Sequence, residues 1–269
     1  MRAPPQSLSC VSALSLEPDG PRGNDADLSI KPTEMKTRIP LTRIVLCVVA
    51  AFCSLSSRLP AESVIDEKFE ANLSPQQWKF KKGEMSSGEG VLTLKAGGPE
   101  EQYQVMYIAT AAPSEKLNFI KNEVTIKLAN LAINGSAPAD KRICMLILGS
   151  DNYEDTSTGM LTLRIPAEGN LLLTIVEKGT DLPQVRHLLS PVSLPIKSLT
   201  LTLRSSGATL VLEDAAGTSE QEIPFPSLPA LWEQASPYLR LQCMRAPSSG
   251  DVQETLEGLR VDSIPAPTK

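Results

Sequence analysis

The segment from Lys197 to Asp214 reads KSLTLTLRSSGATLVLED, and it decides the fold because apolar and polar residues alternate along both of its halves. A period of two places alternate side chains on one face of a β-strand. In the first half these apolar side chains are Leu199, Leu201 and Leu203. Residues 205–208 provide the turn, where Gly207 can take a positive φ without steric cost. The segment therefore predicts a β-hairpin with one apolar face.

A two-stranded hairpin cannot bury its apolar face alone, so the rest of the chain must supply a second layer of sheet. Similar runs recur from residue 62 onward, namely VLTLKA at 91–96, NEVTIKLANLAI at 122–133, MLTLRIP at 160–166, LLLTIVE at 171–177 and YLRLQCMR at 238–245. With the weaker runs they make about a dozen short strands. Helix is nearly absent, since only residues 228–234 suit a short one and prolines surround them. This spacing predicts an all-β sandwich or barrel.

One of these runs contains an irregularity. The apolar residues of 122–133 share one face up to Leu128, whereas Leu131 and Ile133 fall out of that register. An extra residue in a strand shifts the faces in this way, so we expect a bulge near Asn130.

Composition limits the partners. The chain has 269 residues, 41% of them hydrophobic and 4% aromatic, with a single histidine. Residues 1–61 hold 7 basic and 5 acidic residues, so the remainder carries a formal net charge of −7 against −5 for the whole chain. An acidic body with few aromatic rings repels phosphate backbones and anionic lipid and lacks stacking platforms. We therefore expect no nucleic-acid partner.

The beginning of the chain indicates export. Residues 1–34 are rich in Pro, Ser and Asp and read as disordered, or as untranslated if the true start is Met35 rather than Met1. Residues 35–61 have the order of a cleavable signal peptide, because basic residues precede the apolar run IVLCVVAAF and a polar stretch follows it. That run is about half the length needed to span a membrane, so we expect no stable insertion after cleavage. The prediction is a secreted or periplasmic protein.

Residues 62–269 remain after cleavage, which is the size of one β-sandwich domain. Three of the five cysteines lie in the leader, which leaves Cys144 and Cys243 in strand-like runs. An exported pair can form a disulfide if the two strands are neighbours, and two buried free thiols are the alternative. Both interpretations stay open at this point.

The order of short motifs resembles the concanavalin A-like lectin/glucanase jelly roll, which includes LamG-like domains. The motifs that carry the likeness are Asp66-x-x-Phe69, Trp78, Gly-x-Gly-Val-Leu at 88–92, the leucine–threonine hairpin, Tyr-Leu-Arg-Leu at 238–241 and Leu-Arg-Val-Asp-Ser-Ile at 259–264. The resemblance covers nearly all of residues 62–269. It implies a two-sheet antiparallel jelly-roll sandwich whose concave face or rim loops hold sugar in many members, some of which are glycosidases. Fold alone does not decide between binding and catalysis.

Catalytic residues are hard to place in this sequence. Hydrolases of the resembled family carry Glu-x-Asp-x-x-Glu on one strand, and that motif does not occur here. Glu220 and Glu222 are the nearest pair on one strand face, but the third carboxylate and a framing aromatic residue are missing, so a solvated acidic edge explains the pair better than a catalytic site does. The single histidine, His187, lacks the nucleophile elbow that a Ser-His-Asp relay needs, so we expect an ordinary strand histidine.

The remaining candidate binding residues are the oxygen ligands of one polar loop and three aromatic side chains. Asp151, Asn152 and Asp155 lie in one polar loop and offer hard oxygen ligands for calcium, although the twelve-residue calcium-loop pattern is absent. An ordinary hydrophilic loop with no cofactor is the alternative. For glycan stacking the candidate rings are Tyr153, Trp232 and Tyr238. Trp78 is expected in the core.

Three functional hypotheses follow. The preferred one is an exported, non-catalytic β-sandwich module that binds a carbohydrate or another cell-surface polymer. The second is a glycoside-processing enzyme of the same fold, and the third is a structural or assembly domain without a small ligand. The sequence leaves open the ligand, the oligomeric state and whether any catalysis occurs.

Overall fold

The hairpin that decides the fold is present, as strands β11 (Ile196–Arg204) and β12 (Gly207–Asp214) of the computed structural model. Their antiparallel register places Leu199 opposite Leu212 and Leu201 opposite Leu210. Leu199, Leu201 and Leu203 are fully buried in the core, as predicted.

The predicted role of Gly207 was wrong, because its φ is not among the positive values that the backbone adopts. A Cβ atom added to Gly207 would lie 2.5 Å from the carbonyl oxygen of Ile223 on the next strand. Glycine is needed here because two backbones approach closely, and the turn itself is formed by Ser205 and Ser206.

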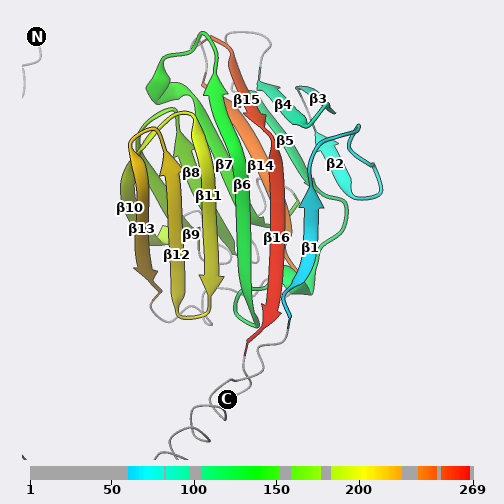
Figure 1. The fold of residues 1–269 in the computed structure, drawn as a ribbon, viewed down its shortest axis with the longest axis vertical. Helices are drawn as coiled ribbons and strands as arrows, with labels where there is room; N and C mark the ends of the chain where they lie inside the picture. Colours follow the sequence, from blue (N-terminus) through cyan, green and yellow to red (C-terminus); the bar gives the residue numbers. More distant parts are fainter. Residues whose placement is uncertain are drawn as a thin grey trace, which may run out of the picture. The chain divides into compact units, whose positions relative to one another are not determined.

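The structure describes residues 60–81, 83–96, 104–151, 159–176, 183–225, 236–246 and 250–266. Sixteen strands in these ranges form two antiparallel sheets, which confirms the predicted two-sheet sandwich. Figure 1 shows one sheet in front of the other. Among the described residues, no helix is long and apolar enough to cross a membrane.

The nine-stranded sheet runs in the order β13-β12-β11-β6-β15-β4-β3, with β16 paired to β6 and β1 paired to β16. Besides β11 and β12, its strands are β1 (Glu62–Glu67), β3 (Glu84–Gly88), β4 (Val91–Ala96), β6 (Asn122–Asn134), β13 (Gly217–Pro224), β15 (Val252–Leu256) and β16 (Gly258–Pro265). The long β6 pairs with β15 near its end and with β16 along most of its length. The buried positions of β6 change phase at Asn130, whose φ is 49°, as the sequence pattern indicated. The pairing register of β6 with β11, β15 and β16 continues without a shift across this residue, so the predicted bulge, an extra residue in the strand, is not present.

The seven-stranded sheet runs in the order β10-β9-β8-β7-β14-β5-β2. Its strands are β2 (Trp78–Lys81), β5 (Gln104–Thr110), β7 (Ile143–Gly149), β8 (Met160–Pro166), β9 (Glu168–Val176), β10 (Pro183–Ser193) and β14 (Tyr238–Arg245). Two single turns of 3-10 helix complete the described elements, η1 (Glu115–Leu117) and η2 (Ala139–Lys141). Trp78 is buried in the core between the sheets, as expected.

Side chains of the nine-stranded sheet cover one edge of the seven-stranded sheet. The backbone N–H of Ser190 on β10 donates to Oε1 of Gln221 at 3.0 Å. The N–H of Ser193 donates to Oδ2 of Asp214 at 2.8 Å. Unpaired N–H groups on an edge strand are a template for aggregation. These two contacts therefore protect β10 and tie the sheet edges together.

We expect Leu201→Ala to lower the free energy of unfolding by about 2–5 kcal/mol, because the truncation removes buried apolar contacts and leaves a cavity between the sheets. Urea denaturation followed by circular dichroism measures this change. Thr200→Ala on the opposite face of the same strand is the control, with an expected loss of about 1 kcal/mol or less. Equal losses in the two variants would contradict the assignment of the leucine row to the core.

Candidate functional site

The outer side of the seven-stranded sheet carries buried polar side chains. On β14, Leu239, Leu241 and Cys243 belong to the core, so the alternate residues face away from it. Two of these alternate residues are Arg240 and Gln242, which are 0% and 4% exposed. Charged and amide side chains are rarely buried this deeply on the outward side of a sheet. We call this side of the sheet the seven-strand face.

The sheet register brings further residues beside this pair. Gln242 lies opposite Tyr107 of β5 and Met145 of β7. Arg240 lies opposite Ile147 of β7, which in turn lies opposite Thr162 of β8. Tyr107 and Thr162 are also buried and do not belong to the core cluster. The centre of the seven-strand face is therefore an enclosed set of polar and aromatic groups.

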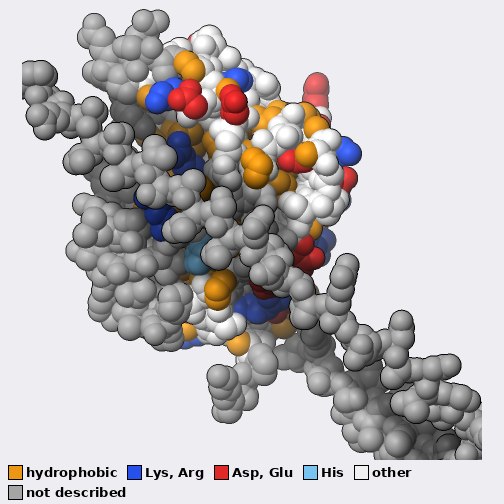
Figure 2. All heavy atoms as spheres, turned by 90° about the vertical axis from the view of Figure 1, so that its left-hand side faces the viewer, with side chains coloured by type: hydrophobic (Ala, Val, Ile, Leu, Met, Phe, Trp, Pro, Cys, Tyr) orange, Lys and Arg blue, Asp and Glu red, His pale blue; other side chains and the backbone are white. Residues whose placement is uncertain are grey.

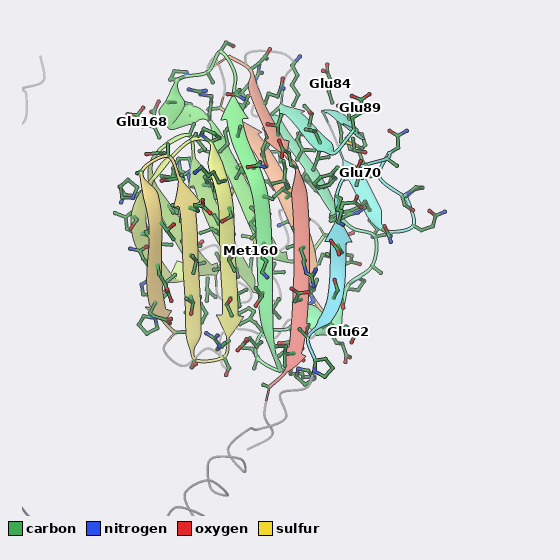
Figure 3. The ribbon with its side chains drawn as sticks, viewed as in Figure 1. Glu62, Glu70, Glu84, Glu89, Met160 and Glu168 are labelled. Carbon is green, nitrogen blue, oxygen red and sulfur yellow. The ribbon has the colours of Figure 1, made fainter. Side chains whose placement is uncertain are left out.

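Several polar atoms in this set have weak partners. The guanidinium of Arg240 lies 5.7 Å from the ring centre of Tyr107, and its Nη2 donates to Sδ of Met160 at 3.5 Å. The Nε2 of Gln242 donates to Sδ of Met145 at 3.7 Å. Thioether sulfur is a weak acceptor. Figure 3 labels Met160, which belongs to β8 of the seven-stranded sheet.

The buried atoms on this face that have no hydrogen-bond partner among the described residues include Oγ1 of Thr162 and Oε1 of Gln242. Leaving a buried polar atom without a partner costs about 1–3 kcal/mol. Such atoms in a native protein call for an explanation, of which a bound ligand or an ordered water is the usual one.

Tyr238 and Asp151, two of the residues predicted from the sequence, lie together at one end of the seven-strand face. The ammonium of Lys79 lies 5.0 Å from the ring centre of Tyr238 and 3.2 Å from Oδ2 of Asp151. The hydroxyl of Tyr107 donates to the backbone oxygen of Asp151 at 3.0 Å. The structure thus joins a predicted ring and a predicted carboxylate to the central set through Lys79 and Tyr107.

The other residues predicted to bind a sugar or calcium lie outside the described residues, namely Tyr153, Trp232, Asn152 and Asp155. The calcium hypothesis therefore stays a prediction. The carboxylate of Asp151 already has a cationic partner in Lys79. Within the described ranges, no three His, Cys, Asp or Glu side chains are close enough together to hold a metal ion.

Glu220 and Glu222 lie on the other sheet. Both are exposed on edge strand β13, and Oε1 of Glu222 accepts a 2.8 Å hydrogen bond from Thr209. The structure therefore does not bring this carboxylate pair to the seven-strand face. His187 is a half-buried residue of strand β10.

A second concave feature lies between strands β1 and β2, at the edge of the sandwich opposite β10 and β13 (Figure 1). This cleft has a volume of about 330 Å³, an apolar floor that includes Trp78 and Leu117, and polar groups such as Asp66 and Gln76. Asp66 is held by Arg260 at 3.7 Å. The cleft has the size of a small-ligand site. Its described side chains contribute no unsatisfied buried atom, so the seven-strand face remains the stronger candidate.

Cys144 and Cys243 lie directly opposite each other on β7 and β14. The structure has them as buried free thiols, not as the disulfide that was one of the two sequence-based alternatives. Both side chains reach across the space between the sheets to β15. The thiol of Cys144 donates to Oε1 of Glu254 at 2.8 Å, and that of Cys243 donates to the backbone oxygen of Val252 at 3.6 Å.

Glu254 is a carboxyl group in the apolar core, 1% exposed, and its Oε2 has no hydrogen-bond partner among the described residues. Burial raises the pKa of Glu254 to about 8, although the hydrogen bond from Cys144 acts in the opposite direction. Burial and the neighbouring Glu254 raise the pKa of both thiols. At neutral pH these three groups are therefore mostly uncharged.

Comparison with known proteins agrees with this architecture. No protein-family model matches the chain, and no curated protein sequence matches it. Among solved structures, peanut lectin with a nine-residue peptide has a TM-score of 0.54 at 9% identity, covering 78% of this chain and 100% of the lectin. Crh5 transglycosylase in complex with NAG has a TM-score of 0.51 at 13% identity, covering 78% and 89%. Lectin I from Ulex europaeus with the methyl glycoside of α-L-fucose has a TM-score of 0.51 at 12% identity, covering 76% and 98%.

These neighbours are concanavalin A-like lectins and carbohydrate-active enzymes, so the chain has the concanavalin A-like fold that the resemblance predicted. At such low identity the likeness establishes the fold and not the ligand.

The sequence reasoning missed Arg240, Gln242 and Thr162. The alternation in YLRLQCMR could have indicated two of them, because Arg240 and Gln242 alternate with leucines. In a strand, such residues must share the side that faces away from the core. What the pattern could not indicate is that this outward side is buried.

We expect the stability of the protein to fall as pH rises from about 4.5 to about 8, because the folded state keeps the proton on Glu254 after the unfolded state has released it. Each pH unit between the two pKa values corresponds to about 1.4 kcal/mol. Thermal denaturation across this pH range measures the stability of the wild type and of Glu254→Gln. The glutamine side chain cannot titrate, and its amide oxygen can still accept a hydrogen bond from the thiol of Cys144. The difference between the two curves should grow with pH and level off above about 8. If the stability of the two proteins changed with pH in parallel, the raised pKa of Glu254 would be contradicted.

Proposed function

We propose that the protein is an exported glycan-binding module that performs no chemistry and binds its ligand on the seven-strand face. The observation that carries the proposal is that two buried polar atoms on this face, Thr162 Oγ1 and Gln242 Oε1, have no hydrogen-bond partner among the described residues. Gln242 also lies opposite Tyr107, whose ring belongs to the same face. Hydroxyl groups of a sugar donate to such oxygens, and sugar rings pack against aromatic side chains. Export is supported by the signal-peptide pattern of residues 35–61.

Two neighbours of the same fold hold sugars, one of them NAG and the other an α-L-fucose glycoside. They show that this sandwich architecture can carry a sugar site. Our proposal that this protein binds a glycan, and that it does so on the seven-strand face, is based on its own residues and not on these neighbours.

The glycoside-processing alternative has less support. Its nearest carboxylates, Glu220 and Glu222, lie exposed on the nine-stranded sheet and apart from the unsatisfied polar atoms. A structural role without a ligand would leave the buried polar atoms of the seven-strand face to ordered water alone.

We expect the mature protein to bind at least one member of a polysaccharide panel, and Thr162→Val and Gln242→Leu to weaken that binding by about tenfold or more each, because both variants remove a hydrogen-bonding atom from the site. Affinity electrophoresis followed by calorimetry measures the change. Both substitutions should leave the free energy of unfolding equal or raise it by about 1 kcal/mol, because they remove a buried polar atom that lacks a partner.

Thr202→Val is the matched control, since its hydroxyl lies 3.3 Å from that of Thr125 on the nine-stranded sheet. It should leave affinity unchanged. The proposal fails if no polysaccharide binds the wild type, or if Thr162→Val and Gln242→Leu bind as tightly as the wild type does. Release of reducing ends that disappears in Glu222→Gln would favour the enzymatic alternative instead.

A further inference from the structure

Arg164 differs from the other basic residues near the centre of the seven-strand face. It follows Leu163 on β8, and Leu163 belongs to the core, so Arg164 faces outward. Its side chain is half-buried and lines a cavity of about 150 Å³ with Ile143 and Met244. Among the described residues, Arg164 forms neither a hydrogen bond nor an ion pair.

The charged residues nearest to this cavity do not neutralise Arg164. Asp140 lies at its rim and is paired with Lys141, with 3.5 Å between carboxylate oxygen and ammonium nitrogen. Glu168, labelled in Figure 3, is exposed at the hairpin end of β9 and forms no ion pair with Arg164 within the described part of the chain. The guanidinium therefore lies beside the apolar side chains of Ile143 and Met244, and no described residue compensates its positive charge.

Arg186 adds a second free cation to the same face. It lies opposite Thr174 of β9, faces outward and is exposed, and no described residue pairs with it. Figure 2, a view onto the β10 and β13 edge, shows Lys and Arg side chains on its left, which is the side of the seven-stranded sheet. The protein from residue 62 onward carries a net charge of −7. A basic face on an acidic body concentrates attraction for an anion at one place.

We infer that the glycan bound on the seven-strand face is acidic, and that Arg164 binds its carboxylate or sulfate group. This inference rests on the proposed function. A half-buried arginine without a partner is incompletely satisfied, and its planar fork of donors matches two oxygens of a carboxylate or sulfate. A charge-assisted pair of this kind is about twice as strong as a neutral hydrogen bond. The neighbouring acceptors Thr162 and Gln242 then receive hydroxyl groups of the same saccharide.

The test compares polysaccharides that share a backbone and differ in charge, namely polygalacturonate against its methyl ester and dextran sulfate against dextran. We expect the wild-type mature protein to bind an acidic member at least about tenfold more tightly than its neutral counterpart, and this preference to weaken as salt rises. Arg164→Gln should abolish the preference. Arg164→Lys should keep part of it, because lysine retains the charge and loses the fork.

Arg260→Gln is the control, because it removes the same charge from an exposed position on the nine-stranded sheet. It should leave the preference intact. An equal loss in Arg260→Gln would mean general charge attraction and would overturn the inference. Equal binding of the charged and neutral members would also overturn it, while the proposed function would stand. Failure of the wild type to bind any charged or neutral polysaccharide would refute both.

Discussion

The structure depends on burying one face of each sheet against the other. Leucine rows such as Leu199, Leu201 and Leu203 supply much of the apolar layer between the sheets, and a hairpin with such a row is not stable by itself. This burial fixes the orientation of every strand, because a shift by one residue would turn a whole row toward solvent. The same constraint fixes the residues that face outward. Arg240 and Gln242 lie on the seven-strand face because Leu239 and Leu241 must lie in the core.

The sequence predicted local structure well, because local structure follows from alternation and turn chemistry. It indicated the hairpin, the sandwich, the buried Trp78 and the change of buried phase at Asn130, although not its cause, since the predicted bulge is absent. It could not indicate which strands are neighbours. That Tyr107 lies beside Gln242, more than a hundred positions later in the chain, depends on pairing between distant strands. Gly207 illustrates the same limit, because its role comes from a backbone oxygen of another strand rather than from its own turn.

Glu254 shows what an inward polar residue does in this fold. Its neighbours in the nine-stranded sheet are Leu94 and Ile133, and its hydrogen bond to Cys144 crosses to the other sheet. Replacing water by apolar neighbours disfavours the charged form, so the pKa rises and the group stays protonated near neutrality. The thiols of Cys144 and Cys243 donate toward β15 in the same region. These contacts fix the sheets relative to each other where β6 leaves β16 and pairs with β15.

The polar groups inside the core and those on the seven-strand face are therefore accommodated in different ways. The carboxyl of Glu254 is enclosed by core residues, so the fold accommodates it by changing its protonation. Thr162, Arg164 and Gln242 face away from the core, and a guanidinium cannot lose its charge near neutral pH. Neither hydroxyl nor amide can adapt by releasing a proton. No described residue supplies a hydrogen-bond partner for Oγ1 of Thr162, Oε1 of Gln242 or the guanidinium of Arg164, and a ligand that presents hydroxyl groups beside an oxyanion would satisfy all three together. An acidic saccharide has that chemistry, and the ligand we propose rests on the charge of Arg164 together with the atoms of Thr162 and Gln242 that lack a partner among the described residues.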